Sequence, residues 1–291
     1  MIIRHHGQTF TVEAEGGALH RCTARRRVGA LVCGDRVVWE PGHNSNGVIV
    51  ALEPRRSLLA RPDSRGQIKA IAANLDRVLI VAAPHANSGG LDTGLIDRYL
   101  VAAELCALRA AVVINKADVF TPVSRAAAEQ RVGIYQGLGY EVLFTSAKHG
   151  LGLGELAALL CEGTGALVGP SGAGKSSLVK ALLPGEEIRI GTVAADGGGR
   201  HTTTWAMLYR LPHGGRLIDS PGVRDYRLWQ AAPAEIAGGF AEFRLYAGSC
   251  RFADCLHLAE PGCAVIQAVE HGTIAAWRYR SYRGLIDSRT G

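Results

Sequence analysis

The chain has 291 residues, of which 47% are hydrophobic and 20% charged, and its formal net charge is +6. These values are typical of a soluble globular protein with two or three domains. No apolar run approaches the ~18 residues of a membrane span, and the first residues lack the apolar core of a signal peptide. We therefore expect a cytoplasmic protein without membrane partners. Seven cysteines in such a chain argue against a disulfide framework.

Short β-like runs alternate with glycine-rich breaks over residues 1 to about 55. The runs cover residues 9–14, 19–25, 35–39 and 47–52. Four or five short strands in so few residues predict a small β-barrel of the OB-fold type, an architecture that often binds nucleic acid. The polar, proline-containing segment 53–66 predicts a linker, so we expect the first domain over residues 1–65.

Arginine is concentrated in this first domain. Residues 1–65 carry ten Arg and no Lys against six Asp and Glu, so +4 of the net charge lies here. Arg25, Arg26 and Arg27 fall at a strand end or loop. They form either a solvated loop or a contact with a phosphate backbone, and we favour the contact because the guanidinium fork suits phosphate.

From residue 66 the pattern changes to alternating buried strands and amphipathic helices. The expected strands are 77–83, 110–114, 141–144 and 165–168, and the expected helices are 95–108, 124–137, 153–160 and 177–183. Continuous apolar runs of this length suit parallel strands buried on both faces. The pattern predicts an open α/β sheet, in which ligand-binding residues follow the carboxyl ends of the strands.

The segment after the strand at 165–168 fits the phosphate-loop pattern G-x-x-x-x-G-K-[ST] at every fixed position. Its residues are Gly169, Pro170, Ser171, Gly172, Ala173, Gly174, Lys175 and Ser176, followed by Ser177 in the helix. Backbone N–H groups would surround phosphate oxygens, Lys175 would reach the β- and γ-phosphates, and the Ser176 hydroxyl would hold Mg²⁺. The alternative is a glycine-rich turn before an ordinary helix.

Two further motifs, each at a predicted strand end, indicate guanine as the base. They are Asn115-Lys116-Ala117-Asp118, an N-K-x-D element, and Thr145-Ser146-Ala147-Lys148, which contains the companion S-A-K element. Asp118 can accept hydrogen bonds from guanine N1–H and N2–H, Lys116 can lie along the base, and the Ala147 N–H would meet O6. The local alternative is that Asp118 is a helix N-cap.

Two switch-like segments follow the phosphate loop. The first is Arg200-His201-Thr202-Thr203-Thr204, preceded by three glycines, and a threonine here, for which we choose Thr203, would bind Mg²⁺ and the γ-phosphate. The second follows a predicted hairpin and is Asp219-Ser220-Pro221-Gly222, a D-x-x-G element. Asp219 would reach Mg²⁺ through water, and the Gly222 N–H would meet the γ-phosphate.

Val223 stands where Ras-like GTPases carry the Gln that orients the attacking water. A valine side chain has no hydrogen-bonding group, so another residue would have to do this. His201 is our candidate, since a neutral imidazole can accept a hydrogen bond from water. The alternative is that His201 is an exposed loop residue.

The order of the motifs differs from that of ordinary GTPases, in which the phosphate loop comes first. Here the N-K-x-D and S-A-K elements precede the phosphate loop, which is followed by the switch threonine and D-x-x-G. The cyclic order of the motifs is unchanged, but the chain begins at a different motif. This is a circular permutation, which is tolerated where native termini lie close together.

The last part of the chain combines a cysteine cluster with two predicted helices. Cys250, Cys255, His257 and Cys263 lie within fourteen residues and predict a structural zinc site. Buried free thiols are the alternative, which suits Cys22, Cys33, Cys106 and Cys161 better. In the helix expected over 273–283, Arg278, Arg280 and Arg283 alternate with aromatic residues. This pattern favours RNA contact and packing on the helix's own domain equally.

Taken together, these motifs resemble the RsgA (YjeQ) family of circularly permuted GTPases. The resemblance covers nearly the whole chain and implies a multidomain α/β protein. Its expected parts are an OB-fold RNA-binding domain (1–65), a circularly permuted GTPase domain (66–228) and a zinc-binding helical domain (229–291). It also implies a GTPase that uses GTP/GDP and Mg²⁺, is stimulated by the small ribosomal subunit, acts late in maturation of that subunit and binds its rRNA.

Two other functions are compatible with parts of the sequence. A phosphate-loop kinase would explain residues 169–176 but would leave the N-K-x-D element and the cysteine cluster without a purpose. A non-hydrolysing RNA-binding module would use guanine nucleotide only for stability. Nucleotide turnover with and without small ribosomal subunits separates the three, and a monomer is our default for the oligomeric state.

Overall fold

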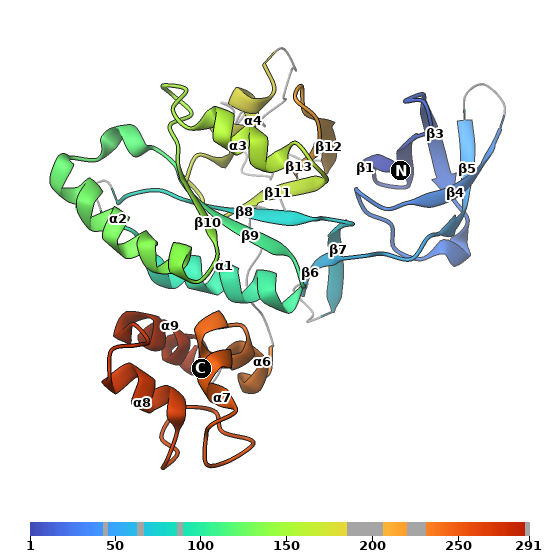
Figure 1. The fold of residues 1–291 in the computed structure, drawn as a ribbon. Helices are drawn as coiled ribbons and strands as arrows, with labels where there is room; N and C mark the ends of the chain where they lie inside the picture. Colours follow the sequence, from blue (N-terminus) through green and yellow to red (C-terminus); the bar gives the residue numbers. More distant parts are fainter. Residues whose placement is uncertain (43–45, 63–66, 86–89, 185–205, 220–230, 289–291) are drawn as a thin grey trace, which may run out of the picture.

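The computed structural model describes residues 1–42, 46–62, 67–85, 90–184, 206–219 and 231–288. An 11-stranded sheet, in the order β10-β9-β8-β11-β13-β12-β1-β2-β3-β5-β4, runs through a central α/β domain into an N-terminal barrel. A helical C-terminal domain lies against the helix α1 side of the central domain (Figure 1). None of the helices within these ranges is long and apolar enough to cross a membrane.

The central domain is built on parallel strands, as predicted. They are β8 (Arg77–Ala82), β9 (Arg109–Ile114), β10 (Glu141–Phe144), β11 (Thr164–Val168) and β13 (Arg216–Asp219). The strand β12 (Met207–Arg210) pairs with β13 in antiparallel fashion and forms the predicted hairpin. Residues of β8 and β9 are almost entirely buried because helices cover both faces of this part of the sheet.

Alternate residues of β8 belong to two separate cores. Val78 and Ile80 pack on the side of α1 (Thr93–Leu105) and α2 (Pro122–Gly137). Leu79 and Val81 pack on the opposite side, toward α3 (Leu153–Leu160) and α4 (Lys175–Leu182). The strand period of two therefore divides one apolar run between two layers of helices. Figure 1 shows the two layers below and above the sheet.

The N-terminal strands form the predicted barrel. They are β1 (Ile2–His6), β2 (Thr9–Glu13), β3 (Leu19–Ala24), β4 (Val37–Pro41) and β5 (Asn46–Leu52), with β3 and β5 parallel. Their inward side chains form a separate core around Phe10, Val12 and Ile49. Backbone hydrogen bonds join Ile2 to Gly34 and Asp35, just before β4, and so bring the first and last strands of the barrel together.

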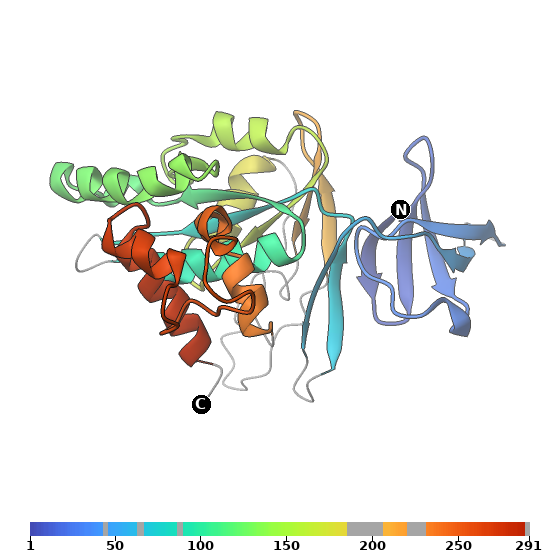
Figure 2. The same cartoon turned by 60° about the horizontal axis from the view of Figure 1, so that its bottom comes forward.

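A hairpin occupies the segment where an irregular linker was expected. The strands β6 (Leu58–Pro62) and β7 (Ile68–Ala73) pair antiparallel and lie between the barrel and the central sheet (Figure 2). Leu59 and Ala72 are fully buried in the core on the α1 side. Of the predicted linker, residues 53–57 are irregular, but the prediction was wrong for Leu58–Pro62, because a proline at the end of an edge strand does not prevent pairing.

The C-terminal domain is helical. It contains α6 (Pro233–Gly238), α7 (Arg244–Ala247), α8 (Ala264–Glu270) and α9 (Ala276–Asp287), with a short 3-10 turn at Ala241–Phe243. Its core is centred on Phe240, Phe243 and Tyr282 and includes Val101 of α1. The domain therefore shares part of its core with the central domain.

Candidate functional site

The phosphate loop joins the buried end of β11 to α4 and comes very close to neighbouring backbone. Gly169 has φ +140°, and a Cβ there would lie 2.2 Å from the carbonyl oxygen of Val81. Gly174 has φ +92°, and a Cβ there would lie 2.2 Å from Nδ2 of Asn115. Both positions therefore require glycine, in conformation and in space.

Lys175 turns its side chain back into the loop that precedes it. Its ammonium donates to the carbonyl oxygens of Gly169 and Pro170, each at 2.7 Å, and the residue is only 7% exposed. Ser171 and Gly172 at the tip of the loop are exposed, and Ser176 is half-buried in the first turn of α4, beside the exposed Ser177. The loop thus places an ammonium and a hydroxyl at the N-terminus of a helix, an arrangement that suits a phosphate.

Asn115 connects the three nucleotide motifs. It is 1% exposed, and its Nδ2 donates to the carbonyl oxygen of Ala173 in the phosphate loop at 2.9 Å. Its Oδ1 accepts from Oγ1 of Thr145 and from the backbone N of Ala147, each at 3.3 Å. One amide therefore holds the three segments in register. The sequence placed Asn115 among nucleotide-binding residues but gave no sign of this bracing.

Asp118 lies beside the S-A-K element. Its Oδ1 accepts a hydrogen bond from Oγ of Ser146 at 2.5 Å, and its side chain is 24% exposed. This hydrogen bond has the largest effect on the pKa of the Asp118 carboxyl and lowers it. Desolvation opposes it less strongly, and the nearby His149 and Lys148 side chains lower the pKa further. The carboxyl is therefore ionised at neutral pH and can accept hydrogen bonds.

His149 is a neighbour of Asp118 that the motif patterns do not include. Its Nε2 lies 3.6 Å from Oδ2 of Asp118. Lys116 adopts a left-handed backbone conformation with φ +60°, and its Cε lies 3.9 Å from the position of a Cβ on Gly174. The Lys116 stem therefore lies alongside the phosphate loop, and Ala117 is buried.

Part of the predicted nucleotide site lies outside the described residues. This applies to His201, Thr203, Gly222 and Val223. Asp219 is described and ends β13, next to β11 and its phosphate loop. The structure therefore brings together Asn115 to Asp118, Ser146 to Lys148 and Gly169 to Ser177, and it places Asp219 at the end of a neighbouring strand.

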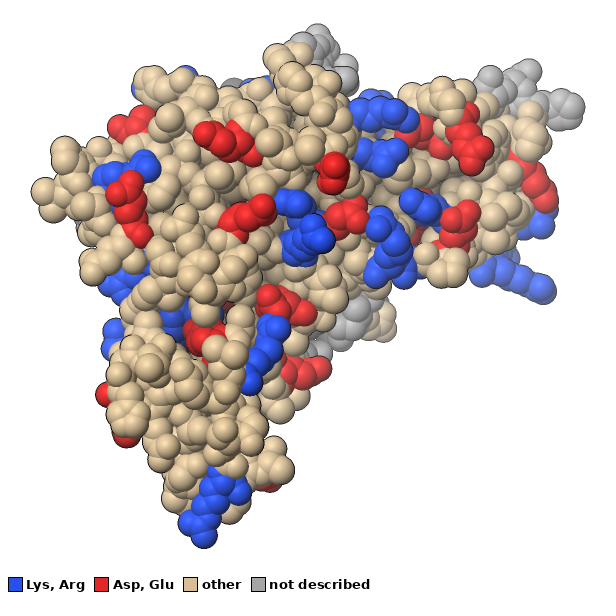
Figure 3. All heavy atoms as spheres, viewed as in Figure 1, with Lys and Arg blue, Asp and Glu red and all other residues tan. Residues whose placement is uncertain are grey.

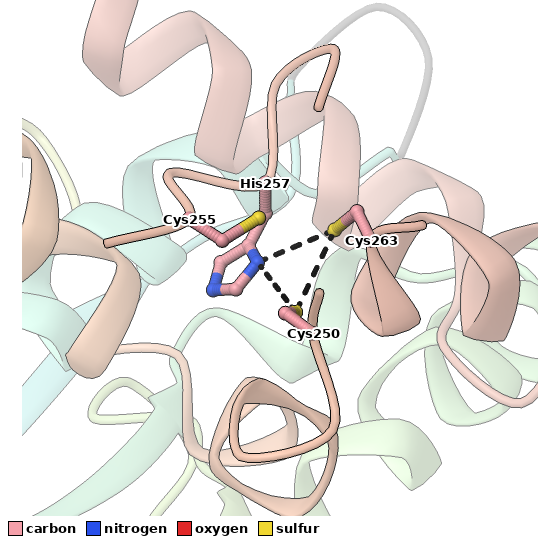
Figure 4. A group of neighbouring side chains, drawn as sticks. All are labelled: Cys250, Cys255, His257 and Cys263. Carbon is pink, nitrogen blue, oxygen red and sulfur yellow. Dashed lines mark hydrogen bonds between the residues drawn. The ribbon is translucent and has the colours of Figure 1, made fainter. Parts of the chain in front are cut away.

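The predicted metal ligands form one cluster in the C-terminal domain (Figure 4). The donor atoms of Cys250, Cys255, His257 and Cys263 lie within 4.8 Å of one another. Nδ1 of His257 is 3.4 Å from Sγ of Cys263 and 3.6 Å from Sγ of Cys250, and the two sulfurs are 3.9 Å apart. A tetrahedral zinc site has sulfur–nitrogen and sulfur–sulfur separations of about 3.6 and 3.8 Å. Three of the four donors therefore already have the separations of a zinc site, and Cys255 lies close enough to complete it.

Hydrogen bonds from outside the cluster hold the loop that carries His257. The Tyr279 hydroxyl donates to the carbonyl oxygen of His257 at 2.7 Å, and the Tyr282 hydroxyl donates to that of Leu256. The Glu260 carboxylate accepts from three backbone N–H groups, those of Leu256, Leu258 and Ala259. Burial raises the pKa of Glu260, but these bonds and the one from its own N–H outweigh it and lower the pKa to about 2. Aromatic residues of α9 thus support this loop.

Arg278 resolves one of the alternatives left open by the sequence. It is 1% exposed, and its guanidinium bonds Asp97 of α1 on one side and Glu242 on the other. This arginine therefore packs between domains, whereas Arg280 and Arg283 on the same helix are exposed. The sequence pattern gave no indication of Asp97 or Glu242 as partners.

Comparison with known proteins gives consistent results. The family model described as RsgA GTPase matches residues 52–229. A protein of Azotobacter vinelandii named small ribosomal subunit biogenesis GTPase RsgA is 48% identical over 297 residues, which cover 99% of this chain and 84% of that protein. A protein of the same name from Haemophilus influenzae (strain 86-028NP) is 45% identical over 293 residues, with the same coverage.

Two solved structures resemble the fold over nearly its whole length. YjeQ from Thermotoga maritima has a TM-score of 0.82 and 33% identity, covering 100% of this chain and 98% of that one. YloQ, described as a circularly permuted GTPase, has a TM-score of 0.76 and 26% identity, covering 99% and 93%.

Proposed function

The chain belongs to the RsgA GTPase family, and on this basis we propose that it hydrolyses GTP to GDP and phosphate, stimulated by the small ribosomal subunit, whose late maturation it assists. The observation that carries the proposal is the set of hydrogen bonds that Asn115 donates and accepts, which brings the N-K-x-D, S-A-K and phosphate-loop segments to one place. With the motif order of a permuted GTPase, this arrangement supports a guanine-nucleotide site. Family membership leaves the kinase alternative without support.

Nucleotide binding would use the phosphate loop as follows. The backbone N–H groups of Ser171 to Ser176 surround the phosphates, and Lys175 exchanges its two carbonyl partners for β- and γ-phosphate oxygens. Ser176 and Thr203 would hold Mg²⁺, which neutralises charge on those oxygens when it is bound. Asp118 accepts from guanine N1–H and N2–H, and Lys116 lies along the base. The Ala147 N–H, held by Asn115 in the free protein, would turn to O6.

Hydrolysis needs a group that orients water, and Val223 cannot supply it. We assign this positioning role to His201, with Asp219 and Gly222 completing the second switch. Binding of the small subunit would order this part of the site. Free protein should accordingly turn over slowly, on the order of 10⁻² s⁻¹ or below.

The remaining parts of the chain would bind the small subunit. The barrel supplies exposed Arg26 and Arg27, which form no ion pair with a carboxylate within the described ranges. Such side chains suit the phosphate backbone of rRNA. The four-ligand cluster would hold one structural Zn²⁺ and keep the C-terminal domain folded. We propose that the protein acts as a monomer in the cytoplasm.

GTP turnover, measured with and without small ribosomal subunits, tests this proposal. Subunits should raise the turnover of GTP but not of ATP, and Lys175→Ala should abolish it. Equal use of ATP would favour the kinase alternative, and binding without turnover would favour the non-hydrolysing module. His201→Ala should remove the stimulation while GTP affinity stays within a few-fold. The matched control is His213→Ala, an exposed histidine in the β12–β13 turn.

A further inference from the structure

A cavity of about 570 Å³ lies between α1, α2 and α9, and none of its lining residues belongs to the nucleotide motifs. Its lining includes Thr93 of α1, Ser124 and Arg131 of α2, and Trp277, Arg280 and Ser281 of α9. This volume is within the usual range of ligand pockets. The cavity therefore spans the junction between the central domain and the C-terminal domain.

The charge of this cavity has one sign. Its two ionisable lining residues, Arg131 and Arg280, are both cations, and within the described ranges neither forms an ion pair with a carboxylate. Two helices of 13 and 16 residues begin at the cavity, so their positive dipole ends add to its potential. The nearby carboxylate of Asp92 caps α1 by accepting from the Leu95 N–H and does not line the cavity. The site therefore attracts an anion.

The exposed Arg131 has its guanidinium over an aromatic ring. Its guanidinium carbon lies 5.1 Å from the ring centroid of Trp277, a half-buried residue. The ring of Tyr135, also on α2, meets Trp277 edge to face at 5.7 Å. A guanidinium placed over a ring loses less freedom when its fork binds a phosphate, and the indole of Trp277 also offers a flat surface to a base.

A larger cavity, of about 710 Å³, is lined by charges of both signs. It lies where the barrel meets the β12–β13 hairpin, and its lining mixes arginines with glutamates. Arg210, for example, already pairs with Glu13 at 2.8 Å. Figure 3 shows Lys and Arg side chains interleaved with Asp and Glu over this junction. That cavity selects no charge, whereas the one between α1, α2 and α9 does.

We propose that the cavity between α1, α2 and α9 binds a nucleotide unit at a site separate from the GTP site. Arg131 and Arg280 hold its phosphate, and its base packs against the Arg131 and Trp277 side chains. The unit comes either from a single-stranded RNA or from a free mononucleotide. The RNA source rests on the proposed function, because the small subunit would supply it, and the free source does not.

The test follows the indole N–H signals of the chain's four tryptophans by NMR, in the full chain saturated with GDP and Mg²⁺. Trp277→Phe identifies the signal of Trp277. The probes are uridine monophosphate, a short single-stranded oligouridylate and inorganic phosphate. Adding a nucleotide probe should shift the Trp277 signal. The double variant Arg131→Ala with Arg280→Ala should bind at least about tenfold more weakly. Arg283→Ala, an exposed arginine of α9 outside the cavity, is the matched control and should bind normally.

Each outcome decides the proposal. A shift with uridine monophosphate supports a free-nucleotide source, and a shift only with the oligouridylate supports RNA. No shift with either probe, or a shift unchanged in the double variant, overturns the proposal. Inorganic phosphate acting as strongly as uridine monophosphate also overturns it, because no base would be recognised. GTP turnover of the same preparations with small subunits is measured separately, so failure here leaves the proposed function standing.

Discussion

Nη1 of Arg278 in α9 lies 2.5 Å from Oδ1 of Asp97 in α1, joining the C-terminal domain to the central domain in a site closed to solvent. The same guanidinium donates to both carboxylate oxygens of Glu242, at 2.6 and 2.8 Å. The Tyr135 hydroxyl donates to Asp97 at 2.6 Å. One buried cation therefore pairs with two buried carboxyl groups, one from each domain.

Replacing Arg278 should destabilise the protein strongly. Arg278→Met leaves Asp97 and Glu242 buried without a cation, and breaking a buried pair in this way costs about 3–5 kcal/mol of unfolding free energy. Denaturant unfolding measures the loss. Arg283→Ala removes the same charge from an exposed position of α9 and should change stability by less than about 0.5 kcal/mol. Equal effects of the two variants would show that the buried contact contributes little.

Asp97 should give stability a distinct pH dependence. Burial raises the pKa of its carboxyl, despite opposing contributions from Arg278 and the hydrogen bonds it accepts. The folded state therefore binds a proton on Asp97 more tightly than the unfolded state does. This proton binding adds to the free energy of unfolding in full below the unfolded pKa of about 3.9, and the added stability is lost as pH rises through the pKa of Asp97 in the folded state. The stability of the wild type relative to Asp97→Asn should fall as pH rises above about 4. A difference that is flat or rises with pH would contradict this.

The fold could be predicted from the sequence, whereas many of the contacts that stabilise it could not. Continuous apolar runs identified the parallel strands, and the motif spacing identified Asn115, because these signals are local. The bond from Asn115 to Ala173 joins residues 58 apart, and no local pattern carries it. Arg278 is similar, since arginines alternating with aromatics suit both an RNA-binding face and a packed helix. Only its burial distinguishes the two.

Guanine selectivity should depend on Asp118. Asp118→Asn replaces an acceptor by an amide that can donate to the xanthine oxygen, so GTP should bind more weakly and xanthosine triphosphate more tightly. Titrations with fluorescent derivatives of GTP and of xanthosine triphosphate measure this change in relative affinity. Asp92→Asn is the matched control, because asparagine caps α1 as well as aspartate does. Wild-type protein that binds ATP and GTP equally would contradict the assignment.

The cysteine cluster should hold about one zinc ion per chain. Cys255→Ser or His257→Ala should lose the metal and unfold the C-terminal domain, because zinc binding and folding are coupled. GTP binding should persist, since residues 169–176 lie in another domain. Cys161→Ser, which changes an exposed thiol outside the cluster, should keep its metal. Folded wild-type protein with no zinc by elemental analysis would refute the ligand assignment.

Asn115 should control affinity for nucleotide without setting the choice of base. Asn115→Ala leaves the Ala173 carbonyl without its 2.9 Å donor and frees the S-A-K segment, so both the phosphate loop and the base pocket lose their brace. A lost buried hydrogen-bond partner costs about 1–3 kcal/mol, so GTP should bind roughly tenfold or more weakly. Preference for GTP over ATP should remain, because Asp118 and its bond from Ser146 are untouched. Thr145→Val removes only one donor to Asn115 and should have a smaller effect in the same direction. Titrations of GTP and ATP against the wild type, Asn115→Ala and Thr145→Val separate an effect on affinity from an effect on the choice of base. If Asn115→Ala lost its preference for GTP as fully as Asp118→Asn, Asn115 would itself contact the base.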